Sequence, residues 1–279
     1  MALESMGDIL TGMFGRAQPE PGDYYGDDGL LVCWLCGTPR ECRMEFFGEL
    51  QIVPCACKCR DEAYTKAEQE RKEEQRRLRI QRMRVEGIQD DSLRGVSFAD
   101  ADDSDTMQKC KAFVEHWADI YRENTGLLMT GPVGTGKTFA AACIANALIE
   151  RGVPVLMTSF PVILGTSKYD LNDVIRQAQE YDLIIVDDLG AERDTDYALE
   201  IMFQFVDARY RSGKPMIVTT NLSPQEMRKT TTLALSRIYD RVLEMCLPMV
   251  FTGGSRRAER RTAKRGILRE ILNGGQDDV

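Results

Sequence analysis

Residues 131–138 have the residue types and spacing of a phosphate-binding loop. They match the pattern G-x-x-x-x-G-K-[ST] in full, in the order Gly131, Pro132, Val133, Gly134, Thr135, Gly136, Lys137 and Thr138. In such a loop the backbone N–H groups turn inward around phosphates, the lysine reaches the β- and γ-phosphates, and the hydroxyl binds Mg²⁺. The sequence therefore predicts that this loop binds ATP and magnesium.

Two further segments end in polar groups that ATP hydrolysis needs. The apolar run LIIV at residues 183–186 leads into Asp187 and Asp188. We expect Asp187 to hold Mg²⁺ through water and Asp188 to polarise the attacking water. The run MIVTT ends in Asn221, which can orient the same water. The predicted catalytic set thus begins with Lys137, Asp187, Asp188 and Asn221.

These groups meet only if their strands lie parallel in one sheet. Short apolar runs alternate with helical patterns in the second half of the chain, which is typical of a parallel sheet covered by helices on both faces. The carboxyl ends of parallel strands share one edge, and ligands bind there. The predicted fold class is therefore α/β, a P-loop NTPase.

The cysteines form a second candidate site. Six of the nine lie between residues 33 and 59, which in a reducing compartment favours a metal over disulfides. Cys33 and Cys36, followed by Gly37, have the spacing of a zinc knuckle, and a second close pair would complete a tetrahedral thiolate site for Zn²⁺. Because the only histidine, His116, is distant in sequence, the second pair is expected among Cys42, Cys55, Cys57 and Cys59.

Composition limits the class of protein. The 279 residues can form one α/β domain and one smaller module. A net charge of −8 argues against a protein that coats nucleic acid by charge alone. No run is long and apolar enough to span a bilayer, and the first residues lack the pattern of a signal peptide. We therefore expect a cytoplasmic protein with no membrane partner.

Shifts in composition divide the chain into six segments. We expect a mostly disordered acidic lead-in at 1–32, a cysteine-rich zinc module at 33–60, a charged helix at 61–86, a polar linker at 87–106, an ATPase domain at 107–265 and a C-terminal tail at 266–279. Residues 256–265, RRAERRTAKR, are basic enough to contact DNA phosphates.

The order of five motifs resembles one family. GPVGTGKT, IIVDDLGAE, VTTN, LSRIYDRV and FTGGSRR follow one another as in the AAA+ ATPases of the DnaC/DnaI helicase-loader group, to which the transposition ATPase IstB is related. The resemblance covers about residues 95–265. It implies an AAA+ domain with a five-stranded parallel sheet, and ring or spiral oligomers whose ATP sites lie between subunits.

The resemblance also implies roles for three arginines. Arg241 is similar to the arginine finger that completes a neighbouring subunit's ATP site, with Arg237 as the alternative, and Arg257 stands where the family has its second sensor arginine. The pair Asp187-Asp188 departs from the Asp-Glu of most AAA+ proteins, so slow hydrolysis is expected; Glu192 is a substitute base.

The cysteine-rich segment resembles the zinc-binding N-terminal region of DnaI-like loaders. In the run VPCACKC the last C-x-C matches the distal ligand pair of that region, which implies Cys57 and Cys59 beside Cys33 and Cys36. Cys42 and Cys55 stay open as replacements.

The function that the resemblance implies is an ATPase that loads the hexameric replicative DNA helicase onto single-stranded DNA. Two alternatives remain. One is an IstB-like ATPase that regulates transposition, although such proteins have a helical N-terminal region without a cysteine cluster. The other is a DNA-binding adaptor that binds ATP without hydrolysing it.

Overall fold

A computed structural model describes residues 15–46, 48–167, 171–190 and 195–254, together with residues 264, 265, 268 and 272. The chain divides into two compact units, Met1–Leu78 and Arg79–Val279. Arg257, Glu192 and most of the basic segment 256–265 lie outside the described residues. None of the described helices is both long and apolar enough to cross a membrane.

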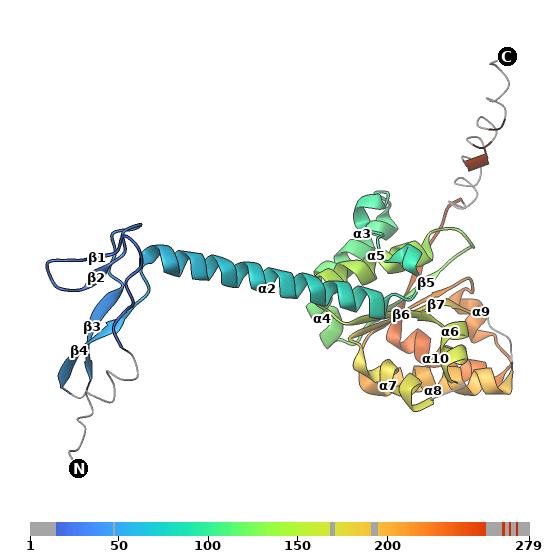
Figure 1. The fold of residues 1–279 in the computed structure, drawn as a ribbon. Helices are drawn as coiled ribbons and strands as arrows, with labels where there is room; N and C mark the ends of the chain where they lie inside the picture. The colour runs from blue at the N-terminus through green and yellow to red at the C-terminus, as the bar shows by residue number, and fades with distance from the viewer. Residues whose placement is uncertain are drawn as a thin grey trace, which may run out of the picture. The chain divides into compact units, whose positions relative to one another are not determined.

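The C-terminal unit contains a five-stranded parallel sheet, as predicted (Figure 1). Its strands, in spatial order, are β6 (Val155–Ser159), β7 (Leu183–Leu189), β8 (Met216–Thr220), β5 (Gly126–Thr130) and β9 (Cys246–Val250). The strand that precedes the phosphate loop therefore lies beside the strand that ends at Asn221, and β7 follows next. The predicted meeting of the strand ends at one edge is confirmed.

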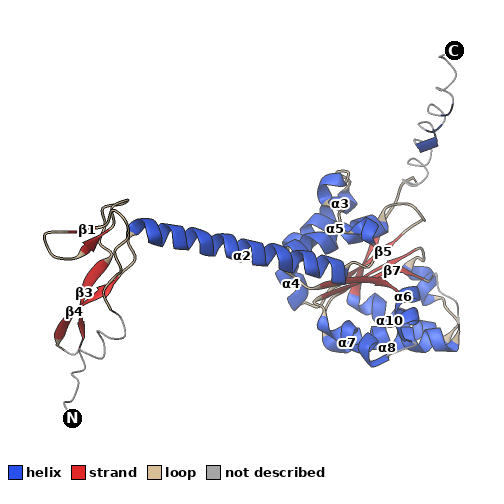
Figure 2. Cartoon of the chain, viewed as in Figure 1, coloured by secondary structure: helices blue, strands red, loops and turns tan. Residues whose placement is uncertain are grey.

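Helices cover both faces of this sheet (Figure 2). One face carries α3 (Asp105–Glu115), α4 (Trp117–Arg122) and α5 (Lys137–Glu150); the other carries α6 (Phe160–Ser167), α7 (Leu171–Glu180), α8 (Asp196–Ser212) and α10 (Leu233–Met245). Side chains alternate along each strand, as the period of two requires. Ile185 and Ile217 thus enter the core under α5, while Ile184 and Val218 enter the core under α8 and α10.

The segment predicted as a polar linker is packed on the sheet of the C-terminal unit. Ile88 is fully buried and forms a parallel bridge with Met157 of β6, and the side-chain amide of Asn146 on α5 donates to the carbonyl of Leu93 at 2.8 Å. Two short 3₁₀ helices, η1 (Asp91–Leu93) and η2 (Phe98–Asp100), follow. The segment predicted as a linker at 87–106 therefore packs on the sheet and on α5 through a few apolar side chains among many polar ones.

The N-terminal unit has little regular structure. It contains two antiparallel pairs, β1 (Tyr24–Tyr25) with β2 (Leu31–Val32), and β3 (Glu41–Phe46) with β4 (Glu49–Pro54). The charged helix predicted at 61–86 lies within α2 (Lys58–Gly87), which begins in this unit; the boundary between the two units falls within that helix.

Residues 15–32 differ from the predicted disordered lead-in. The buried carboxylate of Glu41 accepts hydrogen bonds from the Arg16 guanidinium at 2.8 and 3.1 Å and from the backbone N–H groups of Ala17 and Leu31 at 3.1 and 3.0 Å. Arg40, also buried, pairs with Asp23. Composition suggested disorder because the segment has few apolar residues, but these charged pairs order it.

Candidate functional site

The phosphate loop joins β5 to α5 through glycines whose backbone few other residues could adopt. Gly131 has φ of 143°, and a Cβ there would lie 2.2 Å from the carbonyl oxygen of Phe251. Gly136 has φ of 99° and immediately precedes α5. The first N–H groups and the positive end of this fourteen-residue helix therefore face the loop, an arrangement that suits phosphate.

Lys137 lies at the start of α5 and is buried. Its ammonium donates to the carbonyl oxygens of Gly131 and Pro132 at 2.7 and 3.0 Å and to the side-chain oxygen of Asn221 at 2.9 Å. The structure thus brings the lysine of the loop to the residue that ends β8. A cation held between the loop and the neighbouring strand is positioned to meet the terminal phosphates of a nucleotide.

Asp187 and Thr138 lie together at the bottom of the site. The Thr138 hydroxyl is 2.9 and 3.1 Å from the two carboxylate oxygens of Asp187, and the Thr219 hydroxyl donates to the same carboxylate at 2.6 Å. Burial raises the pKa of Asp187, and the hydroxyl donors counteract that shift. A hydroxyl and a carboxylate at this distance supply hard oxygen ligands of the kind that Mg²⁺ prefers, so the residues fit the predicted ion.

Asp188 has an unusual backbone conformation. Its φ is 62°, in the left-handed region that non-glycine residues seldom occupy, and its N–H donates to the Thr219 hydroxyl at 2.8 Å. The side-chain amide of Asn221 donates to the Asp188 carboxylate at 3.3 Å. The structure therefore places Asp188, unlike the partly buried Asp187, on the exposed side of the site beside Asn221.

A pocket of about 630 Å³ unites these groups. Lys137, Thr138, Asp187, Asp188 and Asn221 line it, as do Val133, Gly134 and Gly136 of the loop. Its remaining wall comes from the segment that follows α2. That wall includes Ser92, Leu93, Gly95, Val96 and Asp100. Sequence reasoning missed this wall; the alternation of Leu93, Val96 and Phe98 with polar residues was the signal that could have found it.

The arginines of α10 have different surroundings. Arg241 forms an ion pair with Asp207 of α8 at 2.6 Å, and its guanidinium lies 4.6 Å from the centre of the Phe203 ring. Arg237 is exposed beside a groove of about 290 Å³ and forms no ion pair within the described part of the chain. The structure therefore engages Arg241 within its own chain and leaves Arg237 accessible to a neighbour.

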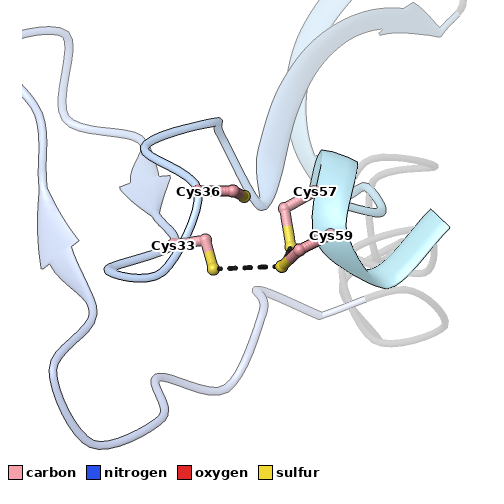
Figure 3. Close-up of side chains that lie close together, drawn as sticks. All are labelled: Cys33, Cys36, Cys57 and Cys59. Carbon is pink, nitrogen blue, oxygen red and sulfur yellow. Dashed lines mark hydrogen bonds between the residues drawn. The ribbon is translucent and has the colours of Figure 1, made fainter. Parts of the chain in front are cut away.

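Four cysteine thiols gather in the N-terminal unit (Figure 3). Cys33 and Cys36 come from the loop after β2, and Cys57 and Cys59 come from the residues that begin α2. The Sγ atom of Cys59 lies 3.7 Å from that of Cys33 and 3.4 Å from that of Cys57, and all four sulfurs lie within 4.8 Å of one another.

The four thiols fit a zinc ion. Tetrahedral zinc with Zn–S bonds of ~2.3 Å requires sulfurs about 3.8 Å apart, close to these separations. The Thr38 hydroxyl, together with backbone N–H groups, lowers the pKa of Cys36 to about 6, while hydrogen bonding with Cys57 and the other thiols raises the pKa of Cys59 to about 12. Cys42 and Cys55 are not members of this group.

Comparison with known proteins agrees with the fold and the nucleotide site. The family model described as IstB-like ATP binding protein matches residues 63–264, which is most of the chain. The chain belongs to the IstB-like ATP-binding protein family.

Two curated members of the wider group are replicative helicase loaders. DnaI of Bacillus subtilis (strain 168) is 25% identical over 246 residues, covering 81% of this chain and 78% of that protein. DnaC of Escherichia coli (strain K12) is 28% identical over 143 residues, covering 49% of this chain and only 56% of DnaC. The chain is thus homologous to both loaders, and its likeness to DnaI is the more extensive.

Solved structures agree on the fold of this IstB-like chain. The crystal structure of DnaI superposes with a TM-score of 0.52 at 24% identity, covering 63% of this chain and 99% of that one. A putative primosome component from Streptococcus pyogenes serotype M3 gives a TM-score of 0.50, covering 59% and 90%. The predicted AAA+ fold, with its five-stranded parallel sheet, is therefore confirmed.

Proposed function

We propose that this protein is an ATP-dependent loader that places a hexameric replicative DNA helicase on single-stranded DNA. The extent of the likeness to the loader DnaI carries the proposal. A match over 81% of 279 residues involves about 226 of them, more than the C-terminal unit contains, so it also includes part of the N-terminal unit. An ATPase that shared only the nucleotide-binding core with loaders would match over a shorter span.

The geometry at the sheet edge supports the proposal of ATP hydrolysis. Lys137 would hold the β- and γ-phosphates, and Thr138 and Asp187 would hold Mg²⁺, which neutralises charge on the phosphates. Asp188 would then accept a proton from water that Asn221 orients. Because Asp188 is one methylene shorter than the glutamate usual in AAA+ proteins, slow turnover is expected, with acceleration when DNA or the helicase is bound.

Assembly would complete the site. Family members place an arginine of one subunit in the ATP site of the next, and we assign this role to Arg237, in place of Arg241, because Arg241 is paired with Asp207. Arg257 stays a prediction for the second sensor. The four cysteines would bind one zinc ion and so order the unit that meets the helicase.

The test is reconstitution with candidate hexameric helicases. The full chain should form a stable complex with its cognate helicase in gel filtration, and ATP should then allow that helicase to enter circular single-stranded DNA and unwind an annealed strand. Lys137→Ala protein should form the complex without supporting entry. Failure of every candidate helicase to bind, with ATP hydrolysis intact, would contradict the loader function.

The regulator of transposition is the second candidate, because the matching family model is named for IstB. Such a protein would prefer duplex DNA and would stimulate strand transfer by a transposase. Comparing the affinity of the full chain for single-stranded and duplex oligonucleotides of equal length separates the two functions. A strong preference for duplex DNA would favour transposition.

A further inference from the structure

The charges of helix α2 are sorted by face. Five basic residues lie within an arc of about 140° around the helix axis, given 3.6 residues per turn. We call Arg71, Lys72, Arg76, Arg79 and Arg82 the arginine stripe; all five are exposed. Gln75 is the other residue between 71 and 82 that this arc contains. The glutamates of the same turns, Glu70, Glu73 and Glu74, fall on the other side of the helix.

Acidic residues of the same helix neutralise only part of the stripe. Lys72 and Arg82, near its two ends, pair with Glu68 and Glu86 at 2.8 Å. Exposed i,i+4 pairs of this kind contribute only a few tenths of a kcal/mol, so a stronger anion can replace them. Arg71 and Arg79 form no ion pair with any residue that the structure describes. From Gln75 to Val85 the helix contains no acidic residue at all.

An aromatic side chain extends the same face. Tyr64 lies seven residues before Arg71, two helical turns away on the same side, and its side chain is 70% exposed. An exposed tyrosine costs little to cover with a flat apolar partner, and nucleic-acid bases stack on such rings. One face of α2 therefore offers guanidinium groups in a row and, beyond them, a ring.

We propose that the arginine stripe and Tyr64 form a binding surface for the backbone and a base of single-stranded DNA. The proposal deepens the proposed function and rests on it, since single-stranded DNA is the substrate proposed there. It adds a contact surface outside the ATPase sheet and the basic segment 256–265. All of these residues lie on one uninterrupted helix, so helix geometry alone places them on a common face.

Two features favour single-stranded DNA over the other occupants of a basic helix face. Four of the five stripe residues are arginines, whose planar fork binds phosphate oxygens in pairs. A duplex keeps its bases stacked inside, whereas a single strand offers them to an exposed ring such as Tyr64. An acidic protein surface would pair with the basic side chains of the stripe, but it would not stack on the Tyr64 ring.

The experiment measures binding of a fluorescent oligothymidylate to the full chain by anisotropy, from 50 to 200 mM salt. The test variant is Arg71→Gln, Arg76→Gln, Arg79→Gln. Its control is Arg77→Gln, Arg122→Gln, Arg211→Gln, which removes the same charge from exposed helical positions outside the stripe. Thermal melting of both proteins shows that they are folded.

We expect the stripe variant to lose about tenfold or more in affinity for the oligonucleotide at 50 mM salt. The slope of log K against log salt should become shallower by about 2, because three phosphate contacts are lost and each contact to a single strand contributes ~0.7 to the slope. The control should stay within about twofold of wild type. Tyr64→Leu should weaken binding more than Tyr64→Phe, because only phenylalanine keeps a ring for stacking.

Three results would overturn the proposal. One is equal weakening by stripe and control variants, which would assign the effect to net charge. Another is unchanged DNA binding with loss of the helicase from the stripe variant, which would make the stripe a protein-binding surface. The third is absence of DNA binding by the wild-type chain. Helicase binding and ATP hydrolysis by the same wild-type preparation show separately whether the proposed function holds.

Discussion

The two units of this protein are stabilised by different kinds of interaction. The C-terminal unit, called the ATPase unit below after its proposed activity, buries apolar side chains on both faces of a five-stranded sheet, so burial of apolar area is its main source of stability. In the described part of the N-terminal unit, few apolar side chains are buried, and its order depends on charged pairs around Glu41 and Arg40 and on four clustered thiols. A small unit without a large core needs such polar links or a metal.

Removal of zinc should have the largest effect, and only on the N-terminal unit. Structural zinc in small domains has apparent binding free energies of about 10–16 kcal/mol. A chelator, or the variant Cys57→Ser, Cys59→Ser, should therefore unfold that unit while the thermal transition of the ATPase unit is kept. Metal analysis of the wild type should give about one zinc per chain.

Cys42→Ser, Cys55→Ser is the matched control for zinc binding, since these thiols lie outside the cluster. It should keep the metal. A wild-type chain that is fully folded without metal, or a control variant that loses it, would contradict the assignment of the four ligands.

Loss of the arginine finger should have the second largest effect, and this effect should be on ATP turnover. Arg237→Ala should lower ATP turnover of the assembled protein by about 10³–10⁵, the range known for arginine fingers. Mixing Arg237→Ala with Lys137→Ala protein should restore activity, because each subunit type supplies what the other lacks. Arg241→Ala should chiefly lower the thermal stability, through loss of its pair with Asp207. If the Arg241→Ala protein kept full thermal stability but did not hydrolyse ATP, the role of arginine finger would be assigned to Arg241.

Asp188→Asn should separate nucleotide binding from hydrolysis. Removal of a general base typically lowers turnover by about 10²–10⁴, so we expect ATP binding to be kept and phosphate release to fall by that factor. Lys137→Ala should instead lose binding, as fluorescent nucleotide titration will show. Near wild-type phosphate release by Asp188→Asn would make Glu192 the base, which Glu192→Gln then tests.

Ile88→Ala tests whether the supposed linker belongs to the ATPase unit. Truncating a fully buried isoleucine costs about 2–5 kcal/mol, so the thermal transition of the ATPase unit should fall by several degrees. Leu78→Ala, at an exposed position of α2, should change it little. Ile80 of α2 is buried in the same apolar cluster as Ile88. A fragment that begins at residue 95 lacks both side chains and should melt below one that begins at residue 79. Equal melting temperatures would show that the segment adds no stability, as expected of a linker.

Acid should act on the N-terminal unit through Glu41, with the smallest effect. Hydrogen bonds from Arg16, with backbone N–H groups, lower the pKa of Glu41 below its usual value of 4.5. A lowered folded-state pKa gives stability that is present above pH ~4.5 and is lost as pH falls through the folded-state value. Glu41→Gln should cost about 1–3 kcal/mol at pH 7 and remove this acid dependence. Chemical denaturation of the zinc-loaded wild type and Glu41→Gln proteins at several pH values measures the loss of stability and its acid dependence. An identical pH profile in the two proteins would contradict the stabilising role of Glu41.

The sequence predicted the nucleotide-binding part of the molecule well because its constraints are local. A glycine-rich turn between a strand and a helix has few conformations, and an apolar run that ends in aspartates fixes where a carboxylate must lie. The four cysteines of the predicted zinc site also came from spacing and resemblance, and the structure gathers their thiols. The assigned roles of these residues stay predictions until they are tested.

Packing between distant segments could not be read from composition. Composition marked residues 87–106 as a linker, yet the burial of Ile88 depends on β6, which lies about 70 residues later in the chain. Composition likewise marked residues 15–32 as disordered, although Arg16 and Asp23 find buried partners at Glu41 and Arg40. Arg241 and Arg237 look alike on a helix face; the positions of Asp207 and Phe203 on a neighbouring helix distinguish them.

By itself, then, the sequence determined the phosphate loop, the aspartates after an apolar run and the parallel sheet, because each depends on residue types at short, fixed spacing. The choice of Cys57 and Cys59 as the second thiol pair came from the family resemblance. The tertiary structure alone decided that Arg241 is paired within its own chain, that Ser92, Leu93 and Val96 line the nucleotide pocket, and that Glu41 is the buried centre of a charged network. Those outcomes depend on contacts between segments far apart in the chain. A local sequence pattern does not show which distant segments will meet or how strongly they will interact.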